Sequence, residues 1–346
     1  MADAPTARRK PAGLRDVAAL AGVSMGTVSN VLNRPHAVAP DTRERVENAI
    51  KELNFVGSHA AVQFRSGRSE LLGVVLPDVG NPFWGDVLRG IESVTDEAEV
   101  FPVVSSTHQD AAREDRALLS FLSRQVNGLL YAPSAAGSAS LSAYLQRDVP
   151  VVIFEHALAD SSIPSVYGDN VAGGRVAAAH LLSLGHRRIV LVNGPRTVSW
   201  SRDRRAGALE ALEDAGASPE DLLEVVVGDL TADQGEAAVD RVLALIPDGG
   251  AIMCGNDLVA LGVLRGLLAR GRHVPEEFSL VGYDDVEFAR ALSPALTTVR
   301  QPSFEMGQLA ATMLLHPEPG EPVHAAFQPE LVLRSSTAPI PGSTGR

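Results

Sequence analysis

Between residues 71 and 283, short apolar runs alternate with stretches whose apolar residues recur at helical spacing. Short runs that are apolar throughout predict strands buried on both faces, which occur almost only in parallel sheets covered by helices. The predicted strands are 71–77, 100–105, 128–132, 151–154, 188–193, 223–227, 251–254 and 279–283, and the predicted helices are 83–98, 111–125, 138–147, 173–184, 202–215, 232–244 and 257–270. The alternation falls into two sets, so we expect an α/β body with two lobes and a cleft between them.

The N-terminal residues follow a different pattern. Apolar residues at helical spacing predict a first short helix at 14–21, and Gly22 marks the point where it must end. Ser24 is a favoured N-cap residue for a second helix, and a third helix is expected at about 41–53. Two short helices joined by a tight turn and braced by a third predict an all-α helix-turn-helix head. The second helix of such a head can enter a DNA major groove.

Charge is distributed unevenly along the chain. Residues 1–68 hold ten Lys or Arg and six Asp or Glu, a formal charge of +4, whereas residues 69–346 hold 20 against 36, a charge of −16. A basic head on an acidic body favours a polyanionic partner for the head, although a solvated basic helix face would look the same. The length of 346 residues and the hydrophobic content of 45% are enough for two or three domains, each with its own core.

Several protein classes are disfavoured by what the sequence lacks. No run of 18 apolar residues is present to span a membrane, and no apolar run follows the basic residues 8–10 as it would in a secretory signal. The single cysteine, Cys254, excludes a disulfide framework and a cysteine-based zinc site, and we interpret it as a small buried hydrophobe. We therefore expect a cytoplasmic protein that needs no cofactor and that joins the nucleoid when it is bound to DNA.

The head carries an ordered set of residues at fixed offsets. Asp16-Val-Ala-x-x-Ala-Gly-Val-Ser24 is followed by Thr27-Val-Ser-x-Val-Leu-Asn33, then by Thr42-Arg-x-x-Val46 and Leu53-Asn-Phe55. This arrangement resembles the head of the LacI/GalR (lac repressor) family of transcriptional regulators almost position by position. The resemblance implies a DNA-binding head at residues 1–57, ordered from about residue 13, and a hinge helix at 58–68 that folds on operator DNA.

The resemblance also implies which head residues touch DNA. Met25, Gly26 and Asn30 match the positions that read base edges. Asn30 can donate to and accept from a base, and Met25 can pack on a thymine methyl group. Gly26 offers no side-chain contact, so the operator is expected to differ from the lac type. The positions that contact phosphates or fix the helix on DNA are matched by Ser24, which also serves as a helix cap, and by Thr27, Ser29 and Asn33.

The hinge resembles the family with two departures. Ala60 and Ala61 match small residues at the close approach of paired hinge helices, and Arg65 suits a phosphate. Phe64 stands where relatives usually have leucine, and an apolar side chain there can wedge between base steps in the minor groove. The alternative is that Phe64 packs beneath the body as a core residue. Gly57 replaces a frequent proline, which should loosen the unbound hinge.

Landmarks of the body resemble the same family, whose body shares its fold with periplasmic sugar-binding proteins. They are Pro77-Asp-x-x-Asn-Pro-Phe83, Gly185-His-Arg-Arg-Ile189, Arg204-x-Ala-Gly207, Asn256-Asp257, Gly282-Tyr-Asp-Asp285 and Leu296-Thr-Thr-Val-Arg-Gln301. The resemblance covers roughly residues 13–336 and implies an effector-binding and dimerisation domain at 69–336. Its N-lobe is expected at about 70–168 and 303–327 and its C-lobe at about 169–299 and 328–336, with a disordered tail at 337–346.

Ligands of open α/β sheets bind beyond the carboxyl ends of the strands, which selects 78–84, Glu155, 197–204, Asn256 and Asp284 without reference to a family. The resemblance places an effector against the same segments. The candidate contacts are Asp78, Phe83, Trp84, Glu155, Trp200, Arg204, Leu230, Asn256, Asp284 and Gln301. A ring of donors and acceptors inside an apolar cleft suits a neutral, hydroxyl-rich ligand such as a sugar.

Some of these residues have a second interpretation. Trp84 and Trp200 can pack on the C–H faces of a sugar ring, or they can be core residues or dimer contacts. Asp284 and Asp285 could be paired carboxylates for acid–base or metal chemistry, but we favour one ligand-facing acceptor and one structural cap. His186 is interpreted as a structural residue at a helix-to-strand corner.

We therefore expect a homodimeric repressor that binds an approximately palindromic operator in double-stranded DNA and is controlled by a sugar-like effector. An enzyme is disfavoured because the sequence has no phosphate-binding loop, nucleophile elbow, complete dinucleotide fingerprint or metal-ligand spacing. A transport-type binding protein shares the body but requires export. No leucine heptad follows Arg334, so a tetramer is not expected.

Overall fold

The computed structural model describes residues 12–55, 69–133, 139–155, 162–317, 320 and 322–340. The chain divides into two compact units, Met1–Ser69 and Glu70–Arg346, here called the head and the body. The predicted hinge helix at 58–68, with Ala60, Ala61, Phe64 and Arg65, lies outside the described residues. In the part of the chain that is described, no helix is long and apolar enough to cross a membrane.

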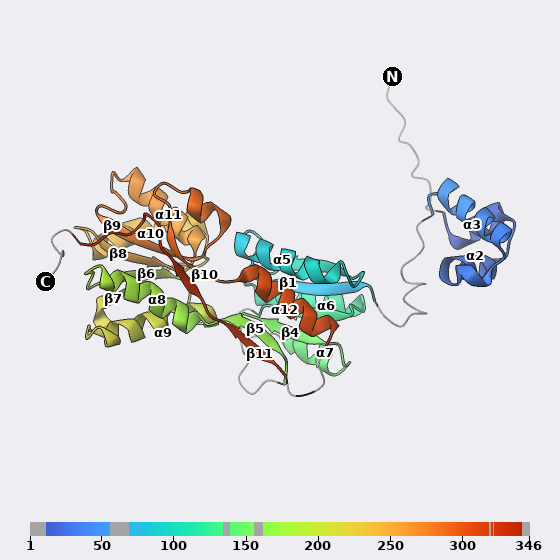
Figure 1. The fold of residues 1–346 in the computed structure, drawn as a ribbon, viewed down its shortest axis with the longest axis horizontal. Helices are drawn as coiled ribbons and strands as arrows, with labels where there is room; N and C mark the ends of the chain where they lie inside the picture. Colours follow the sequence, from blue (N-terminus) through green and yellow to red (C-terminus); the bar gives the residue numbers. More distant parts are fainter. Residues whose placement is uncertain are drawn as a thin grey trace, which may run out of the picture. The chain divides into compact units, whose positions relative to one another are not determined.

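The head consists of three short helices and a 3-10 turn (Figure 1): α1 (Leu14–Ala21), α2 (Met25–Asn33), η1 (Pro35–Ala37) and α3 (Pro40–Glu52). Gly22 follows α1 with φ of 66°, a left-handed conformation that favours glycine. The Ser24 hydroxyl accepts a hydrogen bond of 3.1 Å from the Thr27 amide and so caps α2. The core contains one fully buried valine from each helix: Val17, Val28 and Val46. The helix-turn-helix prediction is confirmed.

The first sheet of the body has six parallel strands in the order β11-β5-β4-β3-β1-β2. Their bounds are β1 Leu71–Leu76, β2 Phe101–Ser106, β3 Gly128–Tyr131, β4 Val151–Phe154, β5 Ser165–Gly168 and β11 His324–Phe327. The helices around it are α5 (Pro82–Thr95), α6 (Ala111–Ser123), α7 (Ser142–Leu145, preceded by η2 at Ala139–Leu141) and α12 (Ser303–Leu315). Successive residues of β1 face opposite sides: Val74 packs with α5 and α12, and Val75 packs with α6 and α7.

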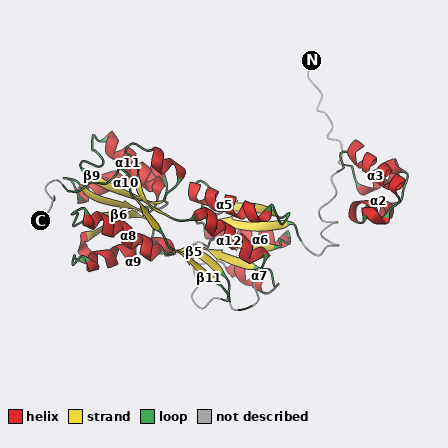
Figure 2. Cartoon of the chain, in the orientation of Figure 1, coloured by secondary structure: helices red, strands yellow, loops and turns green. Residues whose placement is uncertain are grey.

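The second sheet repeats this design in the order β12-β10-β9-β8-β6-β7, with β12 antiparallel to β10. Its strands are β6 Ile189–Asn193, β7 Leu222–Val226, β8 Gly250–Cys254, β9 Phe278–Asp284, β10 Thr297–Arg300 and β12 Glu330–Val332. Its helices are α8 (Asn170–Ser183), α9 (Ser199–Asp214), α10 (Ala232–Leu245) and α11 (Asp257–Ala269), with 3-10 turns η3 (Pro219–Asp221) and η4 (Glu287–Ala291). One apolar cluster lies under α10 and α11 and another under α8 and α9, so this sheet too is buried on both faces (Figure 2).

The predicted two-lobed α/β body with parallel sheets is confirmed, and β12 is the one antiparallel strand among the described strands of the body. The predicted strands and helices between residues 71 and 283 occur in the expected order, although 138–147 holds only η2 and α7. The prediction of a disordered tail from residue 337 was wrong for residues 337–340. The Ala338 amide donates to the Ser279 hydroxyl at 3.0 Å, and the Ile340 amide donates to the Leu184 carbonyl at 3.0 Å. These residues have no helical or charged pattern, but they satisfy polar groups that the second lobe leaves open.

In each lobe, neighbouring helices pack against each other at glycine residues. A Cβ at Gly90 of α5 would overlap the carbonyl of Phe304 in α12, and one at Gly262 of α11 would overlap the carbonyl of Ala232 in α10. In the pair α8–α9, a Cβ at Gly207 would overlap the carbonyl oxygen of Val171. Glycine at these points lets two helix backbones touch, and this fixes the position of the loops at the helix N-termini.

The chain passes between the lobes three times, at 168–170, 300–303 and 327–330. Two of these passages are hydrogen-bonded to each other. The Asp169 amide donates to the Phe327 carbonyl at 2.8 Å, and the Gln328 side chain donates to the Asp169 carboxylate at 3.2 Å. The carboxyl ends of strands from both sheets therefore meet at one place in the body.

Candidate functional site

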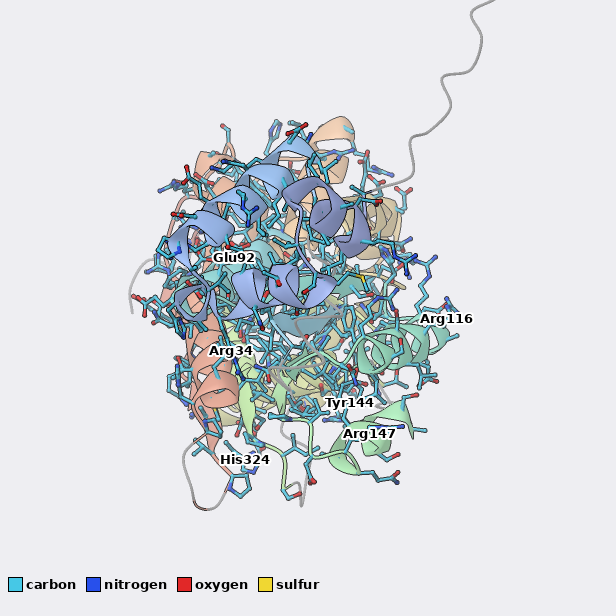
Figure 3. The ribbon with its side chains drawn as sticks, turned by 90° about the vertical axis from the view of Figure 1, so that its right-hand side faces the viewer. Arg34, Glu92, Arg116, Tyr144, Arg147 and His324 are labelled. Carbon is cyan, nitrogen blue, oxygen red and sulfur yellow. The ribbon has the colours of Figure 1, made fainter. Side chains whose placement is uncertain are left out.

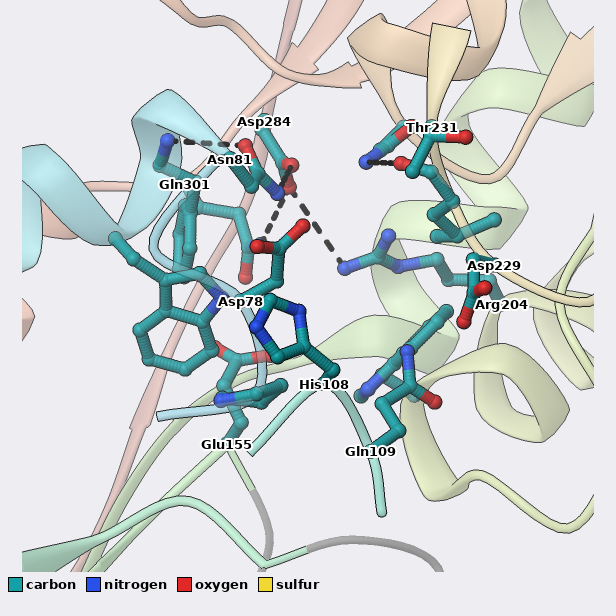
Figure 4. Close-up of a pocket in the computed structure, with 16 residues that line it drawn as sticks. Asp78, Asn81, His108, Gln109, Glu155, Arg204, Asp229, Thr231, Asp284 and Gln301 are labelled. Atoms are coloured by element: carbon teal, nitrogen blue, oxygen red, sulfur yellow. Dashed lines mark hydrogen bonds and ion pairs between the residues drawn. The ribbon is translucent and has the colours of Figure 1, made fainter. Parts of the chain in front are cut away.

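A pocket lies where the strand ends of the two lobes meet (Figure 4). All ten body residues selected from the sequence line it: Asp78, Phe83, Trp84, Glu155, Trp200, Arg204, Leu230, Asn256, Asp284 and Gln301. Six further residues complete the lining: Pro77, Asn81, His108, Gln109, Asp229 and Thr231. The structure therefore brings the ten predicted residues together in one pocket, and their role as effector contacts stays a prediction.

Arg204 reaches the pocket from α9 and is 4% exposed. Its Nε donates to the Asn170 side chain at 2.8 Å, and its Nη1 donates to the Gly255 carbonyl. Nη2 lies 3.8 Å from the Asp284 carboxylate, and the guanidinium lies 3.6 Å from the centre of the Tyr283 ring. Arg204 is thus held by α8, by the strand end after β8 and by β9, and its Nη2 edge is the part that faces the pocket (Figure 4).

Asp284 joins the two lobes. Its carboxylate accepts hydrogen bonds from Asn81 at 3.4 Å and from Gln301 at 3.1 Å, in addition to the contact with Arg204 (Figure 4). Asn81 is the N-cap of α5 in the first lobe, whereas Asp284 ends β9 in the second. Burial raises the pKa of Asp284, and the charge of Arg204 and the two hydrogen bonds lower it. The Asn81–Asp284 contact thus links the two walls of the pocket directly.

Glu155 follows β4 with φ of 64°. It is 8% exposed, and its Oε1 atom is buried without a hydrogen-bond partner. Burial raises the pKa of Glu155 to about 7, Arg204 lowers it, Asp284 raises it, and a hydrogen bond from Asn170 lowers it. The pocket therefore holds one carboxyl group that can be neutral or ionised at physiological pH.

Asn256 makes two hydrogen bonds within the protein that the sequence does not predict. Its side-chain oxygen accepts from the Val259 amide at 2.9 Å and caps α11, and its nitrogen donates to the Leu230 carbonyl at 3.2 Å. The neighbouring Asp257 accepts from Thr298 and from the Val286 amide, so it is directed away from the pocket. Asn256 keeps only one N–H for a ligand.

The acidic pair Asp284-Asp285 divides its roles. Asp285 does not line the pocket, and its carboxylate pairs with Arg300 at 2.8 Å and with Arg334 at 2.5 Å. Among the described residues, no group of three or more His, Cys, Asp or Glu is placed to hold a metal ion. The arrangement of the two carboxylates is that of one pocket acceptor and one structural partner.

The two tryptophans differ. Trp84 is 6% exposed and contacts Phe83 and Phe154 with ring centres 5.0 and 5.6 Å apart, so it belongs to the core of the first lobe as well as to the pocket wall. Trp200 is half-buried and lies 5.3 Å from the Arg204 guanidinium. Trp200 therefore has more of its ring available for a ligand, whereas Trp84 is a tightly packed part of the pocket wall.

Two residues that the sequence suggests are structural, His186 and Cys254, are buried outside the pocket. His186 lies between α8 and β6, and its Nε2 is 2.9 Å from the Ser279 hydroxyl; burial lowers the pKa of its imidazole. Cys254 is fully buried in β8, and burial raises the pKa of its thiol. Both residues sit in the interior of the second lobe, as expected for structural roles.

The pocket residues that the sequence analysis missed come mainly from two strand ends. His108 and Gln109 follow β2 with φ of 52° and 56°, and Asp229 and Thr231 follow β7. The rule that ligands lie beyond the carboxyl ends of strands, applied to these two predicted strands as well, would have selected them.

In the head, α2 has one exposed face. Met25 is 48% exposed, Gly26 and Asn30 are exposed, and Val28 and Val31 on the opposite face are buried. Ser29 is half-buried, and the hydroxyls of Ser24 and Thr27 lie 2.9 Å apart. Asn33 ends α2, and the exposed Arg34 follows it (Figure 3). The described exposed face of α2 thus carries an amide and a thioether and no charged group.

Comparison with known proteins agrees with both units. The description "Bacterial regulatory proteins, lacI family" matches residues 13–58, and "Periplasmic binding protein-like domain" matches residues 178–337. The ribose operon repressor of Escherichia coli K12 is 34% identical over 307 residues, which is 88% of this chain and 92% of that protein. The chain belongs to the LacI family. The HTH-type transcriptional regulator CelR of Thermobifida fusca is 35% identical over 353 residues, which cover 95% of this chain and 99% of CelR.

Solved structures of LacI-family proteins have the same fold. The complex of the transcriptional regulator CelR with cellobiose has a TM-score of 0.71 and 32% identity, and covers 94% of this chain and 99% of that one. The lac repressor dimer bound to operator and the anti-inducer ONPF has a TM-score of 0.79 and 30% identity, covering 95% and 100%. This LacI-family chain is thus related over nearly its whole length to transcriptional regulators.

Proposed function

We propose that this chain is a transcriptional repressor that binds an approximately palindromic operator as a homodimer and changes its operator affinity when a sugar-like effector fills the pocket. The observation that carries the proposal is the presence of a helix-turn-helix head and a two-lobed ligand pocket in one chain. A relative is a ribose operon repressor, and a related structure is a complex with cellobiose. We place its action in the cytoplasm, on the nucleoid.

The composition of the pocket supports a hydroxyl-rich ligand. Asn81, Gln301 and the Nη2 edge of Arg204 surround the Asp284 carboxylate, and Trp200 presents a partly exposed ring. Fixed donors and acceptors beside an aromatic face suit a polyol ring. Asn256, with one free N–H, and Leu230 would supply minor contacts.

We infer that the pocket binds a ligand rather than catalysing a reaction, because the relatives of this chain are transcriptional regulators. The Asp284 carboxylate accepts two hydrogen bonds and lies 3.8 Å from the Arg204 guanidinium, which disfavours it as a nucleophile or a base. The described lining has no serine or cysteine that could act as a nucleophile. A transport-type binding protein would need the pocket but would have no use for the head.

The test is a selection of genomic DNA fragments by the purified protein, followed by titration of sugars against the selected operator. We expect a shared approximate palindrome and a change in operator affinity of roughly fivefold to 150-fold with a bound sugar. Operator affinity that stays constant at saturating sugar would contradict the coupling. Turnover of the sugar would favour an enzyme, and sugar binding without DNA binding would favour a transport protein.

For the head, Met25, Gly26 and Asn30 are proposed to face base edges, while Ser24, Thr27, Ser29 and Asn33 position the helix. Asn30→Ala should weaken specific binding by about 1–3 kcal/mol, because an asparagine amide can donate to and accept from one adenine. Binding to random DNA should be unchanged. Asn48→Ala, at an exposed position of α3, is the matched control and should alter neither. Equal losses on operator and random DNA with Asn30→Ala would show that Asn30 contacts only phosphates.

For the hinge, we propose that Phe64 wedges between base steps in the minor groove. Ala60 and Ala61 would lie where paired hinge helices approach closely, and Arg65 would contact a phosphate.

A further inference from the structure

Two buried side-chain oxygens of the pocket lining have no hydrogen-bond partner, namely Oε1 of Gln301 and Oε1 of Glu155. Oε1 of Glu155 is buried without a hydrogen bond, and the whole residue is only 8% exposed. The backbone of Glu155 has φ of 64°, so the side chain enters the pocket from a left-handed position directly after β4. A buried acceptor is costly to leave unpaired, and in a ligand pocket the missing donor is expected to come from the ligand.

The charged groups around this oxygen are mainly acidic. Besides Glu155, the carboxyl groups of Asp78, Asp229 and Asp284 line the pocket, together with the imidazole of His108. Among the residues described in the lining, Arg204 supplies the one guanidinium. It donates to Asn170 and to the Gly255 carbonyl, and it lies beside the Asp284 carboxylate. Four carboxyl groups against one partly neutralised guanidinium produce a negative potential inside the cleft. Such a cleft repels an anion.

We propose that the effector is a hydroxyl-rich molecule without a phosphate or carboxylate group, and that one of its hydroxyl groups donates a hydrogen bond to Glu155. The inference rests on the proposed function, because it takes this pocket to be the effector site. A hydroxyl supplies the donor that Oε1 lacks. A phosphate would place further negative charge near Glu155 and Asp284, and the guanidinium of Arg204 already lies beside Asp284 and donates two hydrogen bonds within the protein.

The same contact makes binding depend on pH. Burial raises the pKa of Glu155 to about 7, whereas Arg204 lowers it, Asp284 raises it and Asn170 lowers it. A hydroxyl donor favours the ionised carboxylate, so ligand binding releases a proton from the fraction of protein that is protonated. Affinity for a neutral sugar should therefore rise about tenfold between pH 6 and pH 8, and level off at higher pH.

The first experiment compares matched ligands on the full-length protein by titration calorimetry at pH 8. The pairs are ribose and ribose 5-phosphate, and glucose and glucuronate, with cellobiose and nucleosides as further neutral probes. We expect at least one neutral probe to bind, and its anionic partner, where it has one, to bind at least tenfold more weakly. An anionic partner that binds as tightly or more tightly would overturn the inference alone. A panel in which no neutral probe binds would overturn both the inference and the effector class proposed above.

The second experiment assigns the proton. Glu155→Gln keeps the shape and one acceptor of the side chain but cannot ionise, so the affinity of the neutral sugar should change less than about twofold between pH 6 and pH 8. His108→Gln removes the imidazole from the lining and should retain the tenfold dependence, whatever its own affinity. The thermal midpoint of each variant checks that it is folded. A pH dependence that persists in Glu155→Gln, or disappears in His108→Gln, would overturn the role of Glu155.

Discussion

Replacement of Gly207 by alanine is expected to lower the free energy of unfolding of the body by about 3–5 kcal/mol, or to prevent its folding. A Cβ at this position of α9 would overlap the carbonyl oxygen of Val171 and lie 2.7 Å from the backbone nitrogen of Arg175. Both contacts are with the backbone of α8, so no flexible side chain can move to make room. The two helices would have to separate, and Arg204, one turn earlier on α9, would leave its partners.

The matched control for this change is Gly85→Ala. Gly85 also lies inside a helix, α5, but a Cβ there meets nothing within 4 Å. Alanine should therefore stabilise α5 by about 0.5–1 kcal/mol, because glycine loses more backbone entropy on folding. Urea denaturation of both variants measures the difference. A Gly207→Ala variant as stable as the Gly85→Ala variant would mean that the α8–α9 crossing is looser than its backbone contacts indicate.

Arg204→Ala is expected to abolish effector binding and also to lower the free energy of unfolding by about 3–5 kcal/mol. Removal of the guanidinium leaves the Asp284 carboxylate without its cation, the Gly255 carbonyl without its donor and the Tyr283 ring without its cover. These groups are buried, so water replaces the lost contacts poorly. Arg204→Lys should recover little, because one ammonium cannot reach the same three directions.

Two measurements check this second effect, namely sugar titration and urea denaturation. Arg202→Ala is the control, because Arg202 lies on the same helix, is 55% exposed and pairs with its neighbour Asp203 at the surface. That variant should stay within about 0.5 kcal/mol of the parent and bind effector normally. Normal effector binding by a folded Arg204→Ala protein would move the effector site away from this pocket.

The sequence predicts the part of the fold in which pattern and packing agree. Strands such as β1 and β8 are apolar throughout because both of their faces are buried, and α5 carries one clear apolar stripe. The strands that it misses have only three or four residues each: β5 and β10 inside the sheets, and β11 and β12 at their edges. β11 is largely exposed, and β12 has three residues, so neither has an apolar period to detect. Their pairing is decided by the return of the chain from the other lobe, which is a tertiary effect.

The sequence predicts where the pocket lies but not which of its side chains contact one another. Strand ends and the family resemblance select its ten residues because both follow from topology. The Asn81–Asp284 contact joins residues 203 positions apart, and the stacking of Arg204 on Tyr283 depends on how closely α9 approaches α8. Neither contact leaves a local signal. The same holds for Glu155, whose residue type gave no indication that Oε1 would be left unpaired.

The three passages of the chain between the lobes also set an order in time. The head is complete once α3 has been made, whereas the sheet of the first lobe lacks its last strand until β11, at His324–Phe327, has been synthesised. At roughly 5–20 residues per second, these events are separated by a time on the order of tens of seconds. During translation, the helix-turn-helix head can therefore fold well before the pocket is complete. The nascent chain then passes through a stage in which it has the DNA-binding unit but not the pocket proposed to control it.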